Sequence, residues 1–237
     1  MSALAGCASI PPGEHDPNDP HQGFNRSIYQ FNDKLDEAIL KPVSNAYTRT
    51  LPQAVQTGVS NFYSNITYLD TTLNSFLQGK GTQGASDLSR FVVNSTIGIV
   101  GIFDVATPMG LQRHNEDFGQ TLAVWGAHSD SYLMYPLWGP SSVRDTGGIV
   151  VSVLTNPIFY AAAAVAVPLE ILQVVDLRAR HEGFVRFRDE AALDPYVFTR
   201  ESYLQHREFE IYDGNPPRRA IYDEPREPAP APGSRVQ

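Results

Sequence analysis

The feature that most constrains the fold is a run of 21 residues, 149–169, without one charged side chain. Its length matches the roughly 20 residues that a helix needs to span a bilayer. However, Asn156-Pro157 lies near its middle and Pro168 near its end, and proline removes a backbone donor and clashes with the preceding turn. The run therefore predicts two short helices that form a wedge, with Phe159 just after the break. A hairpin buried in a water-soluble core is the alternative.

Apolar residues recur at helical spacing before this run as well. The first set consists of Phe24, Ile28, Phe31, Leu35 and Ile39. It predicts an amphipathic helix with its N-cap at Asp19-Pro20 and its end at Lys41-Pro42. A second set over 51–76 predicts one long helix, or two short ones broken near Asn65, ended by Gly79-Lys80-Gly81. Helical spacing resumes over 85–99.

The chain becomes rich in charge after the apolar run. Asp194 is a suitable N-cap for a final helix, because Pro195 is tolerated in a first turn, and Tyr203, Leu204 and Ile211 follow at helical spacing. No segment shows a clear period of two, which is typical of a half-buried strand. The predicted fold class is therefore all-α.

The two ends differ from the middle in composition. Four prolines lie within residues 11–20 and six within 214–237. Segments of this kind stay extended or disordered. We therefore expect a residual signal over 1–7, a linker over 8–19, one helical domain over 20–213 and a Pro-rich disordered tail over 214–237.

The chain's only cysteine ends the string Leu4-Ala5-Gly6-Cys7, which has the pattern of a bacterial lipobox. The pattern predicts that Cys7 is acylated and serves as the membrane anchor, and Ala8 in place of Asp favours the outer membrane. Because a signal peptide needs about 7–15 apolar residues before its cleavage site, and only six residues precede Cys7, we expect a truncated start. An inert thiol in a disordered end is the alternative.

Charge and absent motifs narrow the function. The net charge is −8, and no basic run interleaves with aromatic residues as a nucleic-acid surface requires. The nearest approach to a lipase elbow, Gly58-Val59-Ser60-Asn61, lacks the last glycine. No histidine pair has zinc-site spacing, and no phosphate loop or dinucleotide motif is present. We therefore expect no catalysis, no metal, no cofactor and no nucleic acid, with a membrane lipase as the least favoured alternative.

Several short strings are more particular than helix periodicity requires. They are Gly23-Phe24-Asn25-Arg26, Phe31-Asn32, Lys41-Pro42-Val43, Gly58 to Phe62, Leu77 to Lys80, Arg90-Phe91, Asn94-Ser95-Thr96, Asp104-Val105-Ala106, Glu116 to Thr121, Gly139-Pro140-Ser141, Arg144-Asp145 and Asp194-Pro195-Tyr196. Together, over about residues 16–210, they resemble the MlaA (VacJ) family of outer-membrane phospholipid-transport lipoproteins.

The resemblance implies a helical ring that lies in the periplasmic leaflet of the outer membrane beside trimeric porins, with an amphipathic channel through its middle. It also implies that phospholipid mislocalised in the outer leaflet passes through the channel to the periplasmic carrier MlaC, so that lipid asymmetry is maintained. A structural lipoprotein that braces porins is the alternative; it would share the anchor and the hairpin but have no lipid path.

Four polar residues are candidates for lining or bracing a track for the lipid headgroup: Arg90, Asn94, Arg144 and Asp145. Arginine is suited to phosphate, but structural ion pairs or helix caps are the alternative for each. A second group is interpreted as structural: Asn61, Phe62, Phe118, Gly119, Asp194, Pro195 and Tyr196. For Tyr196, an interfacial belt and a packed core are both open.

Overall fold

The computed structural model of the chain describes residues 19–127 and 131–217. Its elements are α1 (Gln22–Leu35), a π-helical turn (Asp36–Leu40), α2 (Lys41–Thr50), α3 (Gln53–Leu77), α4 (Gly81–Thr96), α5 (Phe118–Val124), β1 (Tyr132–Tyr135), β2 (Gly139–Ser142), α6 (Val143–Thr155), a 3₁₀ turn (Pro157–Tyr160), α7 (Ala163–Arg180), α8 (Glu182–Ala191) and α9 (Pro195–Ile211). The predicted anchor at Cys7 and most of both predicted tails lie outside the described residues.

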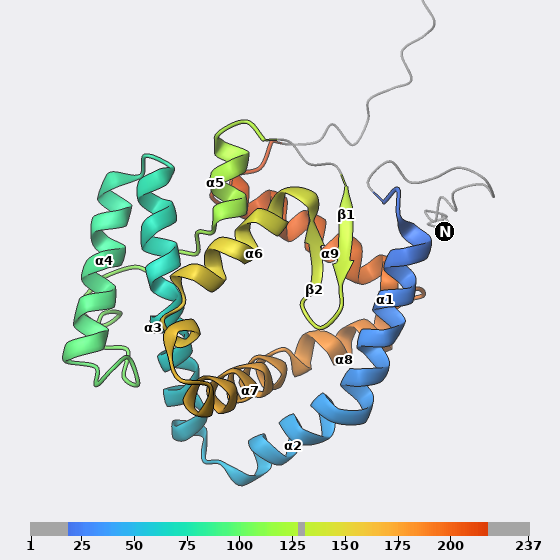
Figure 1. Cartoon of the computed structure of the whole chain (residues 1–237), viewed down its shortest axis with the longest axis horizontal. Helices are drawn as coiled ribbons and strands as arrows, with labels where there is room; N and C mark the ends of the chain where they lie inside the picture. The colour runs from blue at the N-terminus through green and yellow to red at the C-terminus, as the bar shows by residue number, and fades with distance from the viewer. Residues whose placement is uncertain (1–18, 128–130, 218–237) are drawn as a thin grey trace, which may run out of the picture.

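The elements are laid out as a ring (Figure 1). α1 and α2 follow one side and the bottom of the ring, α3 forms the opposite side, and α6 and α7 lie within that outline. α4 packs along the outer side of α3. The all-α class is thus confirmed, with the small β1–β2 hairpin as an addition.

The first helix does not end where the sequence predicts. The chain passes Lys41-Pro42 without a break, because the π-helical turn lets the Lys41 N–H bond to the Asp36 carbonyl and Pro42 follows in the first turn of α2. Its start also differs: α1 begins at Gln22 without a side-chain cap. Asp19 instead turns inward, where it accepts hydrogen bonds from Asn25 and from the Tyr196 hydroxyl.

The second set of apolar residues forms one helix. α3 runs through Asn65 unbroken, which settles the alternative left open by the sequence, and Gly79, with a φ of 77°, ends this segment as predicted. α4 is shorter than the spacing over 85–99 predicts. It ends at Thr96 because the backbone at Ile99 turns into the left-handed region, with a φ of 52°.

The long apolar run is broken at Asn156-Pro157 as predicted. The Asn156 side chain accepts the Ile158 N–H at 2.9 Å, so a backbone donor at the break is paired within the protein. Pro168 does not limit the second limb: it lies inside α7, which continues to Arg180. None of the helices in the described part of the chain has both the length and the apolarity needed to cross a membrane.

Polar side chains of α7 join it to three other segments. Asp176 accepts hydrogen bonds from Tyr47 of α2, at 3.1 Å, and from Ser60 of α3, at 2.9 Å. Arg178 forms a two-pronged ion pair with Asp36 at 2.6 and 2.9 Å. Because α2, α3 and the π-helical turn are consecutive on the outer edge, these contacts help to close the ring.

The β1–β2 hairpin is the element that the sequence analysis misses. Tyr132 pairs with Ser142 and Tyr135 with Gly139, and each strand has only four residues, too few for a recognisable alternation. Two asparagines of α1 bind the edge of this hairpin. Asn25 donates to the Tyr132 carbonyl and accepts from the Met134 N–H, both at 3.0 Å.

Asn32, seven residues further along α1, repeats the arrangement. It donates to the Tyr135 carbonyl and accepts from the Leu137 N–H, both at 2.9 Å. The two amides thus give the β1 edge the hydrogen bonds that a third strand would give. On the same hairpin, Tyr132 and Met134 pack with Tyr196 of α9 into a small apolar cluster.

We predict that Asn25→Ala lowers the free energy of unfolding of the detergent-solubilised protein by about 2–4 kcal/mol, because it leaves buried backbone groups of β1 unpaired at roughly 1–3 kcal/mol each. Urea unfolding followed by circular dichroism measures the effect. Asn45→Ala is the matched control, since no side-chain hydrogen bond of Asn45 is present in the described structure. Equal stability of the two variants would contradict the proposed role of Asn25 in stabilising the edge of β1.

Candidate functional site

Buried side chains in this protein are mostly polar and many large apolar side chains are exposed, which is the reverse of their distribution in a water-soluble protein. Among the described residues, nine apolar side chains are buried, whereas 22 polar or charged residues are buried and 36 large apolar residues are exposed. Scattered exposed apolar residues are normal, but extended apolar surface marks contact with another protein or with a membrane. The interior of this protein is therefore held by hydrogen bonds and ion pairs.

The apolar surface includes the broken hairpin. Phe159 and Tyr160 are exposed at the break, and Val165, Val167 and Ile171 are each more than half exposed on α7. Much of the apolar surface of this limb is left uncovered by the rest of the described chain, although Ile158 and Val175 are buried, and this exposure goes against the alternative of a hairpin buried in a water-soluble core. At the break, the Ile158 N–H is paired with the Asn156 side chain within the protein, as a backbone in contact with lipid requires.

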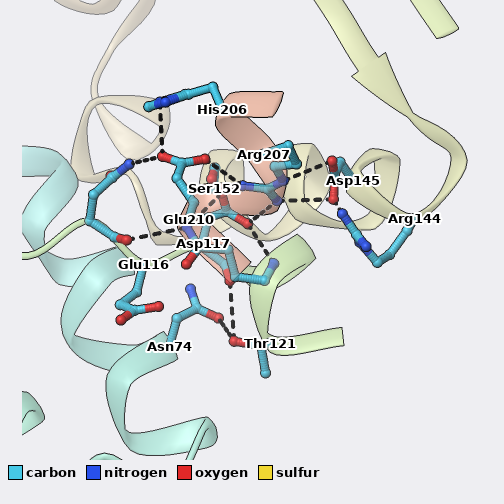
Figure 2. A network of polar contacts seen from close by, with 12 residues as sticks. Asn74, Glu116, Asp117, Thr121, Arg144, Asp145, Ser152, His206, Arg207 and Glu210 are labelled. Atoms are coloured by element: carbon cyan, nitrogen blue, oxygen red, sulfur yellow. Dashed lines mark hydrogen bonds and ion pairs between the residues drawn. The ribbon is translucent and has the colours of Figure 1, made fainter. Parts of the chain in front are cut away.

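Arg207 of α9 lies at the centre of an extended polar network (Figure 2). Its guanidinium forms paired hydrogen bonds with Asp117 at 2.5 and 2.6 Å and with Asp145 at 2.9 Å through two nitrogens. Asp117 is the N-cap of α5 and Asp145 lies in the first turn of α6. One buried cation thus joins the starts of two helices to α9.

The electrostatics of the network keep its carboxylates ionised. Burial alone would raise the pKa of Asp145, but hydrogen bonds from Arg207, together with its charge, outweigh burial and lower that pKa to about 2. The same balance holds the pKa of Asp117 below its usual range. Burial opposes the charge of Arg207, yet the two carboxylates raise its pKa well above the ordinary value.

Gly119 and Arg144 complete the packing around this network. A Cβ at Gly119 would lie 2.3 Å from Asp145 Oδ1 and 2.4 Å from Arg207 Nη2, so only glycine allows the approach. Arg144 donates to Asp145 at 2.9 Å. Phe118 packs edge-on against Trp125, with 6.0 Å between ring centroids.

Arg90 and Asn94 lie in a different place, on α4. Arg90 is 3% exposed and donates to the Leu111 carbonyl and to Asp104, both at 2.6 Å. The side-chain oxygen of Asn94 accepts the N–H groups of Val105 and Ala106, both at 2.9 Å. Both side chains therefore hold the loop that follows α4.

That loop has a strained backbone and an apolar surface. Ile99 and Val100 adopt left-handed φ values of 52° and 58°, which β-branched residues rarely do. Such strain persists only where the surroundings over-determine the conformation. Backbone hydrogen bonds from Val100 to Ser95 and from Gly101 to Asn94 hold this turn. The side chains of Arg90 and Asn94 fix the residues that follow it, and Ile99, Val100 and Phe103 stay exposed.

A small pocket lies between α3, α4 and this loop. It is lined by Asn61, Ser64, Asn65, Tyr68, Arg90, Asn94, Asp104 and Arg113. The Asn65 side-chain oxygen is buried there without a hydrogen-bond donor in the described structure. Arg113 is exposed, and no ion pair of its guanidinium is present among the described residues. The pocket therefore contains a buried unpaired acceptor, has room for about one water molecule, and has the exposed Arg113 among its lining residues.

The candidate residues thus separate into three groups. Asn61, Arg90 and Asn94 share the pocket, whereas Gly119, Arg144 and Asp145 belong to the Arg207 network. Asp194 caps α9 by accepting the Tyr196 and Val197 N–H groups, and Pro195 is its first residue. Tyr196 is 2% exposed, so it packs in the core rather than in an interfacial belt. Phe62 packs edge-on against Tyr63.

Sequence reasoning did not single out Arg113 or Arg207. Arg207 lies 62 residues after Asp145 on another helix, and no local pattern links two such positions. Arg113 follows an irregular loop that has no periodicity. The only signal for either residue in the sequence was the general preference for arginine over lysine.

Two arrangements bear on catalysis. Ser60 donates its hydroxyl to Asp176, at 2.9 and 3.0 Å. His114 and Ser75 both contact Asp87, at 2.7 and 2.8 Å, so the serine is bonded to the carboxylate rather than to the imidazole. Neither arrangement has the order of nucleophile, base and orienting acid that a hydrolase requires.

A ring of helices with a polar interior and an apolar surface is typical of helical proteins whose surface contacts lipid, and this is the class of the protein. Comparison with known proteins gives the family.

A family model described as MlaA lipoprotein matches residues 17–210. The chain is 32% identical over 234 residues to the "Intermembrane phospholipid transport system lipoprotein MlaA" of Shigella flexneri and of Escherichia coli (strain K12), covering 93% of this chain and 92% of each relative. A solved structure from work on the "structural basis for maintenance of bacterial outer membrane lipid asymmetry" is 31% identical, with a TM-score of 0.70, and the match covers 83% of this chain and 99% of that one. The chain belongs to the MlaA lipoprotein family.

We predict that Asp145 makes stability depend on pH in the acid range. Because its pKa is about 2 in the folded protein and about 3.9 when unfolded, it contributes roughly 2 kcal/mol above pH ~4, which is lost as the pH falls towards 2. Asp145→Asn should lower stability by about 3 kcal/mol at pH 7 and flatten the dependence between pH 4 and 2. Urea midpoints across this range measure both effects, and Glu190→Gln, at an exposed site, is the control. An unchanged pH profile in Asp145→Asn would refute the assignment.

Proposed function

We propose that this protein is an outer-membrane lipoprotein that removes phospholipid from the outer leaflet and so maintains lipid asymmetry. Its family membership supports this role, because MlaA relatives are named for intermembrane phospholipid transport. The single structural observation that carries it is the reversed burial, with 36 large apolar residues exposed around a polar interior. A body of this kind is suited to lie in one leaflet and to offer a polar path to the headgroup.

The hairpin and the loop after α4 would sit among the acyl chains. Asn156, Pro157, Phe159 and Pro168 lie on a limb that has several exposed apolar side chains. Each buried CH₂ contributes about 0.8 kcal/mol, so the exposed apolar surface would be stable only in lipid. We place this surface in the periplasmic leaflet.

For the headgroup track, Asn61, Arg90 and Asn94 offer a polar wall with Arg113 at its opening. Arg113 would attract the phosphate, because arginine binds phosphate oxygens through several N–H donors. Arg144 and Asp145 brace the ring from the Arg207 network.

The partners follow from the same role. A trimeric porin beside the ring and a soluble periplasmic carrier, MlaC, would hold the protein in place and receive the lipid. No ATP-binding loop is present in the sequence, so flow would be downhill or driven by another component. A role in bracing porins alone is the competing function.

We expect Cys7 to carry the lipid anchor. Mass spectrometry of the mature N-terminus should find acyl chains on Cys7, and Cys7→Ser should move the protein out of the outer-membrane fraction. Several acyl chains anchor durably, since a single chain gives only reversible binding. An unmodified Cys7 together with unchanged fractionation of Cys7→Ser would exclude the anchor.

The transport role is tested in a Gram-negative host that lacks its own MlaA. Arg113→Gln should slow removal of outer-leaflet phospholipid by about fivefold, which corresponds to roughly 1 kcal/mol, and labelling of surface-exposed lipid measures it. Arg49→Gln is the control, because Arg49 is exposed on α2 and makes no ion pair among the described residues.

Two outcomes would go against the proposal. Deletion of the gene could leave outer-leaflet phospholipid unchanged while porin trimers weaken. That result would favour the competing function, in which the protein only braces porins. A normal rate in Arg113→Gln would remove Arg113 from the track.

A further inference from the structure

A second cleft lies on another part of the ring, between α1, α8 and the start of α9. Its volume is about 210 Å³, and it is lined by Arg26, Tyr29, Gln30, Asp33, Arg188, Asp189, Asp194, Pro195 and Tyr196. This volume is smaller than the roughly 300–1,000 Å³ typical of sites for whole ligands, so the cleft has room for a headgroup but not for a whole lipid. Two strings that the chain shares with the family, ending at Arg26 and beginning at Asp194, meet in this cleft although they lie 168 residues apart.

Two guanidinium groups are held in fixed orientations at the cleft. Arg26 lies over the ring of Tyr196, 4.5 Å from its centroid, and Arg188 lies over Tyr29 at 5.7 Å. Each guanidinium has five N–H donors. Arg26 uses its two terminal nitrogens on Asp194, and Arg188 uses Nε on Asp189 and Nη2 on Asp33. Nε of Arg26 and Nη1 of Arg188 make no hydrogen bond among the described residues.

Carboxylates lie beside both cations. Asp33 is 3.1 Å and Asp189 is 2.7 Å from the Arg188 guanidinium, and both carboxylates are more than one-third exposed. Ionised carboxylates accept several hydrogen bonds each, so their outer lone pairs can bind an ammonium group. The cleft therefore presents donors for an anion and acceptors for a cation within one opening.

Exposed apolar residues are neighbours of the lining residues in the sequence. Leu193, immediately before the capping residue Asp194, is 95% exposed, and Phe187 of α8 is 57% exposed. Phe184 and Phe187 both pack against Phe198, with ring centroids 5.8 and 5.9 Å apart. A ligand in the cleft would thus have apolar side chains beside it.

We propose that this cleft binds the headgroup of a zwitterionic phospholipid of the phosphoethanolamine class. Arg26 and Arg188 donate to the phosphate, Asp33 and Asp189 accept from the ammonium, and an acyl chain lies along Phe187 and Leu193. The site is separate from the pocket at Arg90, and it rests on the proposed function only in that the protein meets phospholipid. It would hold one lipid at the outside of the ring.

Native mass spectrometry of the full chain in detergent tests the site with two probes, phosphatidylethanolamine and phosphatidylglycerol with the same acyl chains. Arg188→Gln should reduce the number of retained phosphatidylethanolamine molecules by one, with an affinity loss of roughly tenfold, as expected for a charged hydrogen bond. Asp33→Asn should weaken phosphatidylethanolamine but not phosphatidylglycerol. Arg186→Gln, on the same helix but 72% exposed, should change neither.

Three results would overturn the proposal. The first is equal loss in Arg186→Gln, which would mean a general charge effect. The second is an unchanged lipid preference in Asp33→Asn, which also keeps the test valid if Arg188→Gln folds poorly. The third is displacement by free O-phosphoethanolamine at the lipid's own concentration, which would make the site one for a soluble phosphate ester. If Arg113→Gln still slows phospholipid removal as expected, any of these three results rejects the cleft alone and leaves the proposed function standing.

Discussion

The structure depends on the pairing of Arg207 with Asp117 and Asp145. Water-soluble domains are held together by apolar burial, but here only nine apolar side chains are buried among the described residues. A buried ion pair stabilises only when its hydrogen bonds are nearly complete, and both carboxylates meet that condition through the two-sided contact with one guanidinium. The starts of α5 and α6 are fixed by the same contact, so the course of the apolar hairpin follows from it.

With this reversed burial, polar residues hold the helices together inside the protein and apolar residues form much of its surface. Hydrogen bonds of Asp176 and Arg178 join α7 to the outer helices, and Asn25 and Asn32 bind the hairpin edge. Because these contacts lie inside, the outward positions are left to apolar side chains. In lipid the low dielectric would strengthen the internal contacts, whereas in water the exposed apolar surface would favour association.

Local signals in the sequence predicted most of the helices. Asn156-Pro157 breaks the apolar run and Asp194 begins α9, because proline and capping residues act on their own neighbourhood. The predicted end of the first helix at Pro42 was wrong, since the π-helical turn before Pro42 depends on packing rather than on local preference. The β1–β2 hairpin and the partner of Asp145 were beyond prediction for a related reason: both rest on contacts between residues far apart in sequence. The candidate residues on α4 were found, but their task of holding a strained loop was not.

The π-helical turn adds one residue to the rod formed by α1 and α2. The exposed apolar residues Phe24 and Phe31 are seven positions apart, whereas Phe31 and Ile39 are eight apart. An ordinary α-helix would rotate the later residues by about 100° for that extra position, and the wider turn absorbs the rotation. The π-helical turn therefore keeps the apolar residues before and after it on one side of the helix. A chain one residue shorter at this point, with a regular α-helix, would keep the same apolar residues aligned.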